Sequence, residues 1–259
     1  MADSRTVDDK SAASVAPKVE TPSAYTDPLH AAIEPELLSA LHDAMMGSDP
    51  LAGRNMIQHA IANGVPASDI ADHYIPTLAR GYGAMWCSDE MGFADVTIAT
   101  SRLQGALREL EQRWSSSKPT SGPVSTVLLL VPKDIFHTLG AFVLKGQLRR
   151  KGISVKLLLG ASAKTIPEEL RGASFDAIFI SVSQGEELSS LRTLVDTIRG
   201  EMTQAPPIII GGAALDTVAA DAVLRKTGAD FAAQELTKAL DYCGRRRTKR
   251  DDHSNKYRG

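Results

Sequence analysis

The chain has 259 residues, with 29 lysines and arginines against 31 aspartates and glutamates, so its formal net charge is −2. This balance argues against a protein that binds nucleic acid through its overall charge. Two cysteines are too few for a disulfide scaffold, and no apolar run reaches the ~18–20 residues of a membrane span. The first 25 residues lack the apolar core of a signal peptide. We therefore expect a cytoplasmic protein with enough chain for two cores.

The N-terminal half has the pattern of a tail followed by a small helical bundle. Residues 1–25 are small, polar and proline-containing, which predicts a disordered tail. Residues 26–114 show helical periodicity in four stretches, which start near Pro35, Pro50, Ser68 and Asp95. Pro76 interrupts the third stretch and is expected to kink it. Four helices with short connections predict a four-helix bundle over residues 26–114.

The pattern changes after a segment rich in Ser, Pro and Gly at residues 115–123, which predicts an interdomain linker. Four short apolar runs follow, at residues 127–131, 155–159, 177–182 and 208–210, with a weaker run at 230–233. Helical stretches separate them. Apolar strands that alternate with helices are typical of a parallel sheet covered on both faces. Residues 124–243 are therefore expected to form a doubly wound α/β domain with a five-stranded parallel sheet.

Three strand ends carry residues suited to ligand binding, and in such a sheet they meet at one edge. The first strand is followed by Asp134, Phe136, His137, Thr138, Leu139 and Gly140. The third ends in Ser181 and Ser183, and the fourth is followed by Gly211 and Gly212. Imidazole is a good ligand for a borderline transition metal, and paired glycines leave room for a bulky group. Taken singly, each has an ordinary explanation as a surface residue, a cap or a turn.

The spacing of these residues resembles a known signature. The order is His-x-x-Gly, 40 residues, Ser-x-Ser, 27 residues and Gly-Gly, which resembles the cobalamin-binding motif of methionine synthases, mutases and corrinoid proteins. The resemblance implies that His137 displaces the lower base and coordinates cobalt, and that Ser181, Gly211 and Gly212 line the slot for the nucleotide tail. Two positions depart from the motif. Ile135 stands where the family has Asp, which leaves Asp134 as the nearest carboxylate, and Ser183 replaces Leu or Thr.

The helical bundle resembles the cap that precedes the cobalamin domain in methionine synthases and cobalamin photoreceptors. Trp86 matches the aromatic residue that lies over the cofactor's upper face, and a core tryptophan is the alternative reading. Val96 and Thr97 stand where the photoreceptors have a Glu-His pair. Cys87, beside Trp86, is expected to be a buried structural residue. The segment 86–104 and the loop at residues 137–140 are similar to the AerR/PpaA family of photosynthesis antirepressors of purple bacteria, over about residues 27–240.

This resemblance implies a cobalamin-binding, light-responsive transcriptional regulator that is not an enzyme and binds adenosylcobalamin or hydroxocobalamin. Its partner would be a repressor of the CrtJ/PpsR type. Two alternatives stay open: a corrinoid protein that carries methyl groups for a methyltransferase, and a domain that has lost cobalamin. Residues 244–259 form a basic segment that is expected to be a disordered tail. Its cations are either solvated or make a weak contact with nucleic acid or an acidic partner: Arg245, Arg246, Arg247, Lys249 and Arg250.

Overall fold

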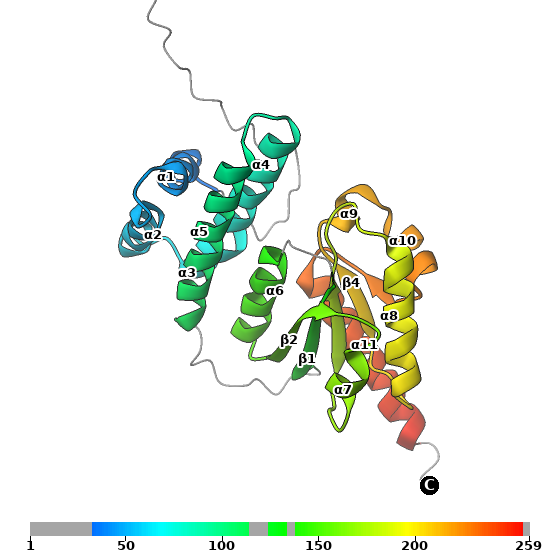
Figure 1. Ribbon diagram of the computed structural model, residues 1–259. Helices are drawn as coiled ribbons and strands as arrows, with labels where there is room; N and C mark the ends of the chain where they lie inside the picture. The colour runs from blue at the N-terminus through cyan, green and yellow to red at the C-terminus, as the bar shows by residue number, and fades with distance from the viewer. Residues whose placement is uncertain (1–32, 114–123, 134–137, 256–259) are drawn as a thin grey trace, which may run out of the picture.

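The computed structural model describes residues 33–113, 124–133 and 138–255, and it consists of a helical cap beside an α/β domain (Figure 1). The expected N-terminal tail and the linker at residues 115–123 lie outside the described residues. Within these ranges, no helix combines the length and apolarity that crossing a membrane requires.

The cap contains the four helical stretches that the periodicity predicts. They are α1 (Pro35–Met46), α2 (Ala52–Ala62), a composite third helix and α5 (Phe93–Gln112). The composite helix runs through α3 (Ala67–Asp69), a π-helical turn η1 (Ile70–Tyr74) and α4 (Ile75–Cys87). In the π turn, the Ile75 N–H reaches back to the Ile70 carbonyl. This wider turn lies directly before Pro76, which has no N–H to donate to the carbonyl one turn earlier.

The α/β domain is built on a parallel five-stranded sheet, as the alternation of strands and helices predicts. The strands are β1 (Thr126–Pro132), β2 (Ser154–Ala161), β3 (Ala177–Ser181), β4 (Ile208–Gly211) and β5 (Phe231–Ala232). Their order in the sheet is β2-β1-β3-β4-β5, and all neighbours are parallel. Asp176 fixes the register between β1 and β3, because its carboxylate accepts hydrogen bonds of 2.8–3.0 Å from the N–H groups and hydroxyls of Ser125 and Thr126.

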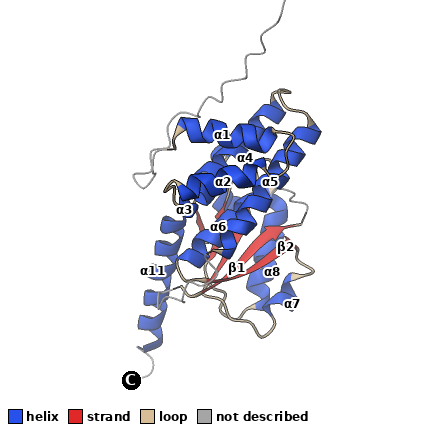
Figure 2. Cartoon of the chain, turned by 90° about the vertical axis from the view of Figure 1, so that its left-hand side faces the viewer, coloured by secondary structure: helices blue, strands red, loops and turns tan. Residues whose placement is uncertain are grey.

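Helices cover both faces of the sheet, so β1, β3 and β4 are apolar on both sides, whereas the edge strand β2 is partly exposed. The helices of this domain are α6 (Leu139–Arg150), α7 (Ile166–Leu170), α8 (Leu188–Glu201), α9 (Ala214–Thr217), α10 (Ala220–Thr227) and α11 (Leu236–Asn255). Leu128, Leu130 and Ile178 pack toward α7, α8 and α10. The alternate positions, including Leu129 and Phe179, pack toward α6 and α11. Helix α6 lies between the cap and the sheet in both views (Figures 1 and 2).

The C-terminal segment differs from the expected disordered tail. Helix α11 continues through Gly244 and the basic residues to Asn255. Arg246 stabilises this extension from within the protein, because its guanidinium lies 2.9 Å from Asp230 and donates to the Tyr242 hydroxyl over 3.0 Å. The hydrogen bond from Arg246 to Tyr242 is the main reason that the pKa of this guanidinium is raised. The side chains of residues 247–259 lie outside the described part of the chain.

Candidate functional site

The candidate site lies at the edge of the sheet where the parallel strands end. Ser181 is the last residue of β3 and pairs in register with Gly211, the last residue of β4. Because side chains alternate along a strand, Ser181 faces the same side as Phe179, toward α6 and α11. Two neighbouring strand ends therefore present only a hydroxymethyl group and a hydrogen atom on that side. The structure thus brings Ser181 together with Gly211 and Gly212, which come from a later strand end.

The two glycines occupy positions that a larger residue would not fit. A Cβ atom on Gly211 would lie 2.9 Å from the Ala233 carbonyl oxygen. A Cβ atom on Gly212 would lie 2.4 Å from the Val182 carbonyl oxygen, and its φ of +110° is in the region that favours glycine. The backbone after β4 therefore packs directly against the end of β3. The glycines at this strand end are therefore required by the packing of the protein's own backbone.

The loop that follows β1 carries the remaining motif residues. Asp134, Phe136 and His137 lie outside the described residues, so their place in the site stays a prediction. Thr138 is half-buried at the start of α6, and Gly140 is exposed in its first turn. Leu139 is buried, and its side chain belongs to the core of the cap rather than to the open edge of the sheet.

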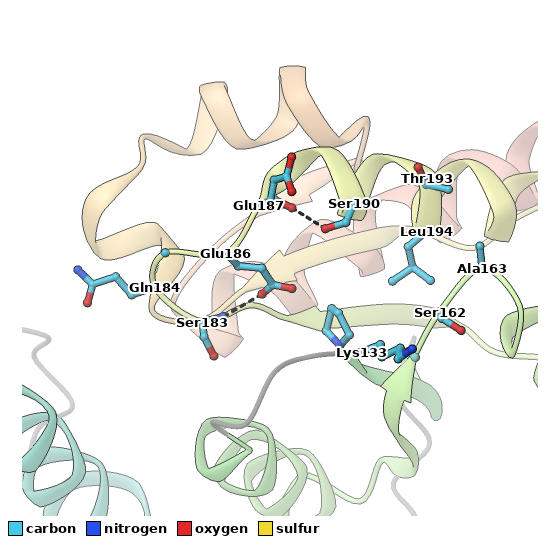
Figure 3. A pocket seen from close by; sticks show the side chains of 13 residues that line it. Lys133, Ser162, Ala163, Ser183, Gln184, Glu186, Glu187, Ser190, Thr193 and Leu194 are labelled. Atoms are coloured by element: carbon cyan, nitrogen blue, oxygen red, sulfur yellow. Dashed lines mark hydrogen bonds between the residues drawn. The ribbon is translucent and has the colours of Figure 1, made fainter. Parts of the chain in front are cut away.

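A cavity of about 710 Å³ lies at the same edge of the sheet, on the side of α8, and its lining side chains are drawn in Figure 3. Lys133 from the end of β1, Ser162 from the end of β2 and residues 183–187 after β3 line it, with Leu194 of α8 behind them. Ser183 is one of the residues that line this cavity, and its backbone N–H donates to Glu186, while its side chain points away from Glu186 (Figure 3).

Glu186 is the titratable group in the cavity with an altered acidity. Burial raises the pKa of its carboxyl to about 7, although a hydrogen bond from the Ser183 N–H, 3.3 Å long, acts in the opposite direction. Near neutral pH this side chain is therefore divided between a neutral acid, which can donate a hydrogen bond, and a carboxylate, which accepts one. Sequence reasoning did not single out Glu186, because its acidity depends on burial that only the fold creates.

Three large apolar residues of the cap are exposed: Trp86 at the end of α4 and Phe93 and Ile98 on α5, which are 45%, 73% and 49% exposed. The alternative reading of Trp86 as a core residue is thus wrong. The sequence did not single out Phe93 and Ile98. Their position outside the apolar stripe of α5, which includes Ala99 and Leu103, is the signal that could have revealed them as exposed. Cys87 is exposed as well, so the expectation of a buried structural cysteine is wrong.

Comparison with known proteins decides the family. Residues 125–241 match the B12 binding domain family. The chain is also 36% identical over 173 residues to a Rhodobacter capsulatus protein, described as an uncharacterized 20.5 kDa protein in the bchF-crtJ intergenic region. This match covers 67% of the chain and 89% of the relative. The chain belongs to the AerR/PpaA-type family of B12-binding-domain proteins. The family resemblance seen in the sequence is thereby confirmed.

The overall fold is also shared with a corrinoid protein. The monomethylamine corrinoid protein of Methanosarcina barkeri superposes with a TM-score of 0.65, over 81% of this chain and 98% of that one. The sequence identity is 19%, so this likeness concerns the fold alone. It confirms the expected arrangement of a helical region followed by a doubly wound parallel sheet. This AerR/PpaA-type protein therefore carries a cobalamin-binding domain behind a helical cap.

Proposed function

We propose that this AerR/PpaA-type protein is a cobalamin-dependent, light-responsive regulator that relieves repression by a CrtJ/PpsR-type repressor. The observation that carries the proposal is the likeness to the Rhodobacter capsulatus protein, whose description places it between bchF and crtJ. The match covers 67% of the chain, which is longer than either the cap or the α/β domain alone, so it includes parts of both. Such a regulator acts by binding two states of its partner unequally.

The residues proposed to hold the cofactor are those of the three strand ends. His137 is the proposed cobalt ligand, with Asp134 as the nearest carboxylate to orient it. Ser181, Gly211 and Gly212 are proposed to receive the nucleotide tail, and the exposed Trp86 to face the upper side of the corrin. The cofactor supplies a light-sensitive cobalt–carbon bond when its upper ligand is an alkyl group. The protein's own part is to bind the corrin and to change its surface with the cofactor's state.

The first test addresses the cofactor. Purified protein is incubated with adenosylcobalamin or hydroxocobalamin, in the dark and after light, and its absorption spectrum and cobalamin retention on gel filtration are measured. We expect His137→Ala to weaken cobalamin binding by at least about tenfold. His59→Ala is the matched control, because His59 is exposed on α2 and bonds to Asn63 within the cap. An unchanged spectrum and retention in His137→Ala would refute the assignment of the ligand.

The second test addresses the output. A gel-shift assay follows a CrtJ/PpsR-type repressor on DNA, with cobalamin-loaded wild-type protein or His137→Ala added. We expect loss of the repressor–DNA complex only with the loaded wild-type protein. The corrinoid methyl carrier is the competing function, because this chain shares its fold with such a protein. Methyl transfer to the bound corrinoid from a methyltransferase, without any effect on the repressor, would decide for the carrier.

A further inference from the structure

Helix α6 belongs to two hydrophobic cores at once. Leu139 and Val143 are buried in the core of the cap. Ala141 and Leu148 are fully buried against the sheet. The helix begins at Leu139, two residues after His137, so the segment that carries the proposed cobalt ligand continues directly into an element that the cap holds. Figures 1 and 2 show α6 between the cap helices and the strands.

The C-terminal half of α6 is fastened to the cap by ion pairs. Glu111, in the last turn of α5, pairs with Lys145 at 2.9 Å and with Arg149 at 3.2 Å. Asp72, in the π turn η1, pairs with Arg150. The Glu111 and Asp72 side chains are only 15% and 18% exposed. Salt and water screen such sheltered pairs much less than surface pairs, so their geometry holds the two elements together.

A polar contact joins the cap to the other end of α6. The Gln104 side-chain amide lies 3.5 Å from the Thr138 hydroxyl, next to His137. The cap therefore contacts α6 along its whole length. The contacts involve Thr138 at the start of α6, the apolar side chains of the first turns of α6, and the basic side chains at the end of α6. By contrast, the ion pair between Arg54 and Glu109 connects α2 to α5 within the cap, and its side chains are 52% and 44% exposed.

We infer that Asp72 and Glu111 are positioning residues that join the cap and α6 into one rigid body, so that the cap follows the state of the cofactor loop by moving with α6. The inference rests on the proposed function, because it requires cobalamin at the loop that carries His137. It adds a route for the signal. When the start of α6 shifts, the contacts that α5 and η1 make with α6 shift with it. A cap that contacted only the sheet would not respond to a shift of α6.

The test is hydrogen exchange of backbone amides in α5 and η1, measured with and without hydroxocobalamin. The absorption spectrum in the same samples reports whether the cofactor is bound. We expect cobalamin to change exchange at these amides by roughly fivefold or more in the wild-type protein. In Asp72→Asn/Glu111→Gln, we expect cobalamin to bind with the wild-type spectrum, while the response of the cap is lost. Glu109→Gln is the matched control and should respond as the wild type does.

A variant in which the two charges of an ion pair are swapped distinguishes this positioning role from a general loss of structure. Asp72→Arg combined with Arg150→Asp restores an ion pair of opposite polarity, and we expect it to restore the response of the cap. The inference would be overturned if the charge-swapped variant did not recover the response of the cap. It would also be overturned if Asp72→Asn/Glu111→Gln showed the full response. Wild-type protein that binds cobalamin without any change in cap exchange would overturn it as well and leave cobalamin binding standing. A wild-type protein without a cobalamin spectrum would overturn both proposals.

Discussion

At the scale of single residues, Glu186 shows how the fold changes the chemistry of a side chain. Its carboxyl lies in the cavity beside α8, and burial raises its pKa from 4.5 to about 7. The folded protein therefore holds this proton more tightly than the unfolded chain does. The stabilisation that results is fully present below pH about 4.5, and it is lost as the pH rises through about 7.

We predict that Glu186→Gln removes this pH dependence, because an amide does not ionise. The variant should match the wild type near pH 4.5 and exceed its free energy of unfolding above pH 7 by about 1–2 kcal/mol, after allowance for solvent screening. Urea unfolding at the two pH values measures the difference. Glu187→Gln is the control, since Glu187 is the exposed neighbour of Glu186. Equal pH dependence in wild type and Glu186→Gln would contradict the prediction.

At the scale of elements, the backbone after β4 is packed against the end of β3. The Val182 N–H donates to the Gly211 carbonyl over 2.8 Å, and the Ala214 N–H donates to the Val182 carbonyl over 3.3 Å. These hydrogen bonds bring the two strand ends together and leave no room for a side chain at position 212. The pair of glycines in the motif thus has a structural role that is independent of any ligand.

Gly212→Ala is expected to destabilise the protein by about 2–5 kcal/mol, because the new methyl group adds a steric clash to an unfavourable φ. Gly64→Ala is the matched control. Gly64 also has a positive φ, of +96°, but no atom lies within 4 Å of the position of its Cβ, so only the backbone cost of about 1–2 kcal/mol applies. Urea unfolding of both variants checks the prediction, and equal losses would show that the clash is relieved.

At the scale of the whole molecule, the cap and the α/β domain share α6. Val143 is buried in the core of the cap, although it belongs to a helix of the domain. The ion pairs of Glu111 and Asp72 cross the same boundary. Two units that bury apolar and charged groups against each other in this way are expected to unfold together rather than one after the other.

We predict a single cooperative transition. Trp86 lies in α4 of the cap, whereas Trp114 lies outside the described residues. In a Trp114→Phe background the fluorescence of Trp86 therefore reports on the cap, whereas far-ultraviolet circular dichroism reports on all helices and strands. The two urea transitions should coincide. Val143→Ala should lower the free energy of unfolding by about 1–3 kcal/mol and move both transitions equally. A fluorescence transition that occurs at lower urea than the dichroism transition would show that the cap unfolds independently.

The sequence by itself determined the periodic elements and the spacing of the motif. The cap helices and the strands were predictable, because an apolar stripe or a short apolar run depends on local neighbours alone. The gaps between Gly140, Ser181 and Gly211 pointed to a cobalamin-binding domain through their resemblance to the motif of that family. The three elements of the motif could be expected at one edge because parallel strands end there.

Only the tertiary structure decided the features that depend on packing between distant segments. It brought Ser181 beside Gly211, and it exposed Trp86, for which a core position was the alternative, and Cys87, for which burial was expected. It also ordered α11 through the basic segment, because Arg246 finds Asp230 in another part of the chain. Burial and long-range charge pairing arise from contacts between residues far apart in sequence. A local pattern carries no record of those contacts, so the coupling of the cap to α6 became visible only in the folded protein.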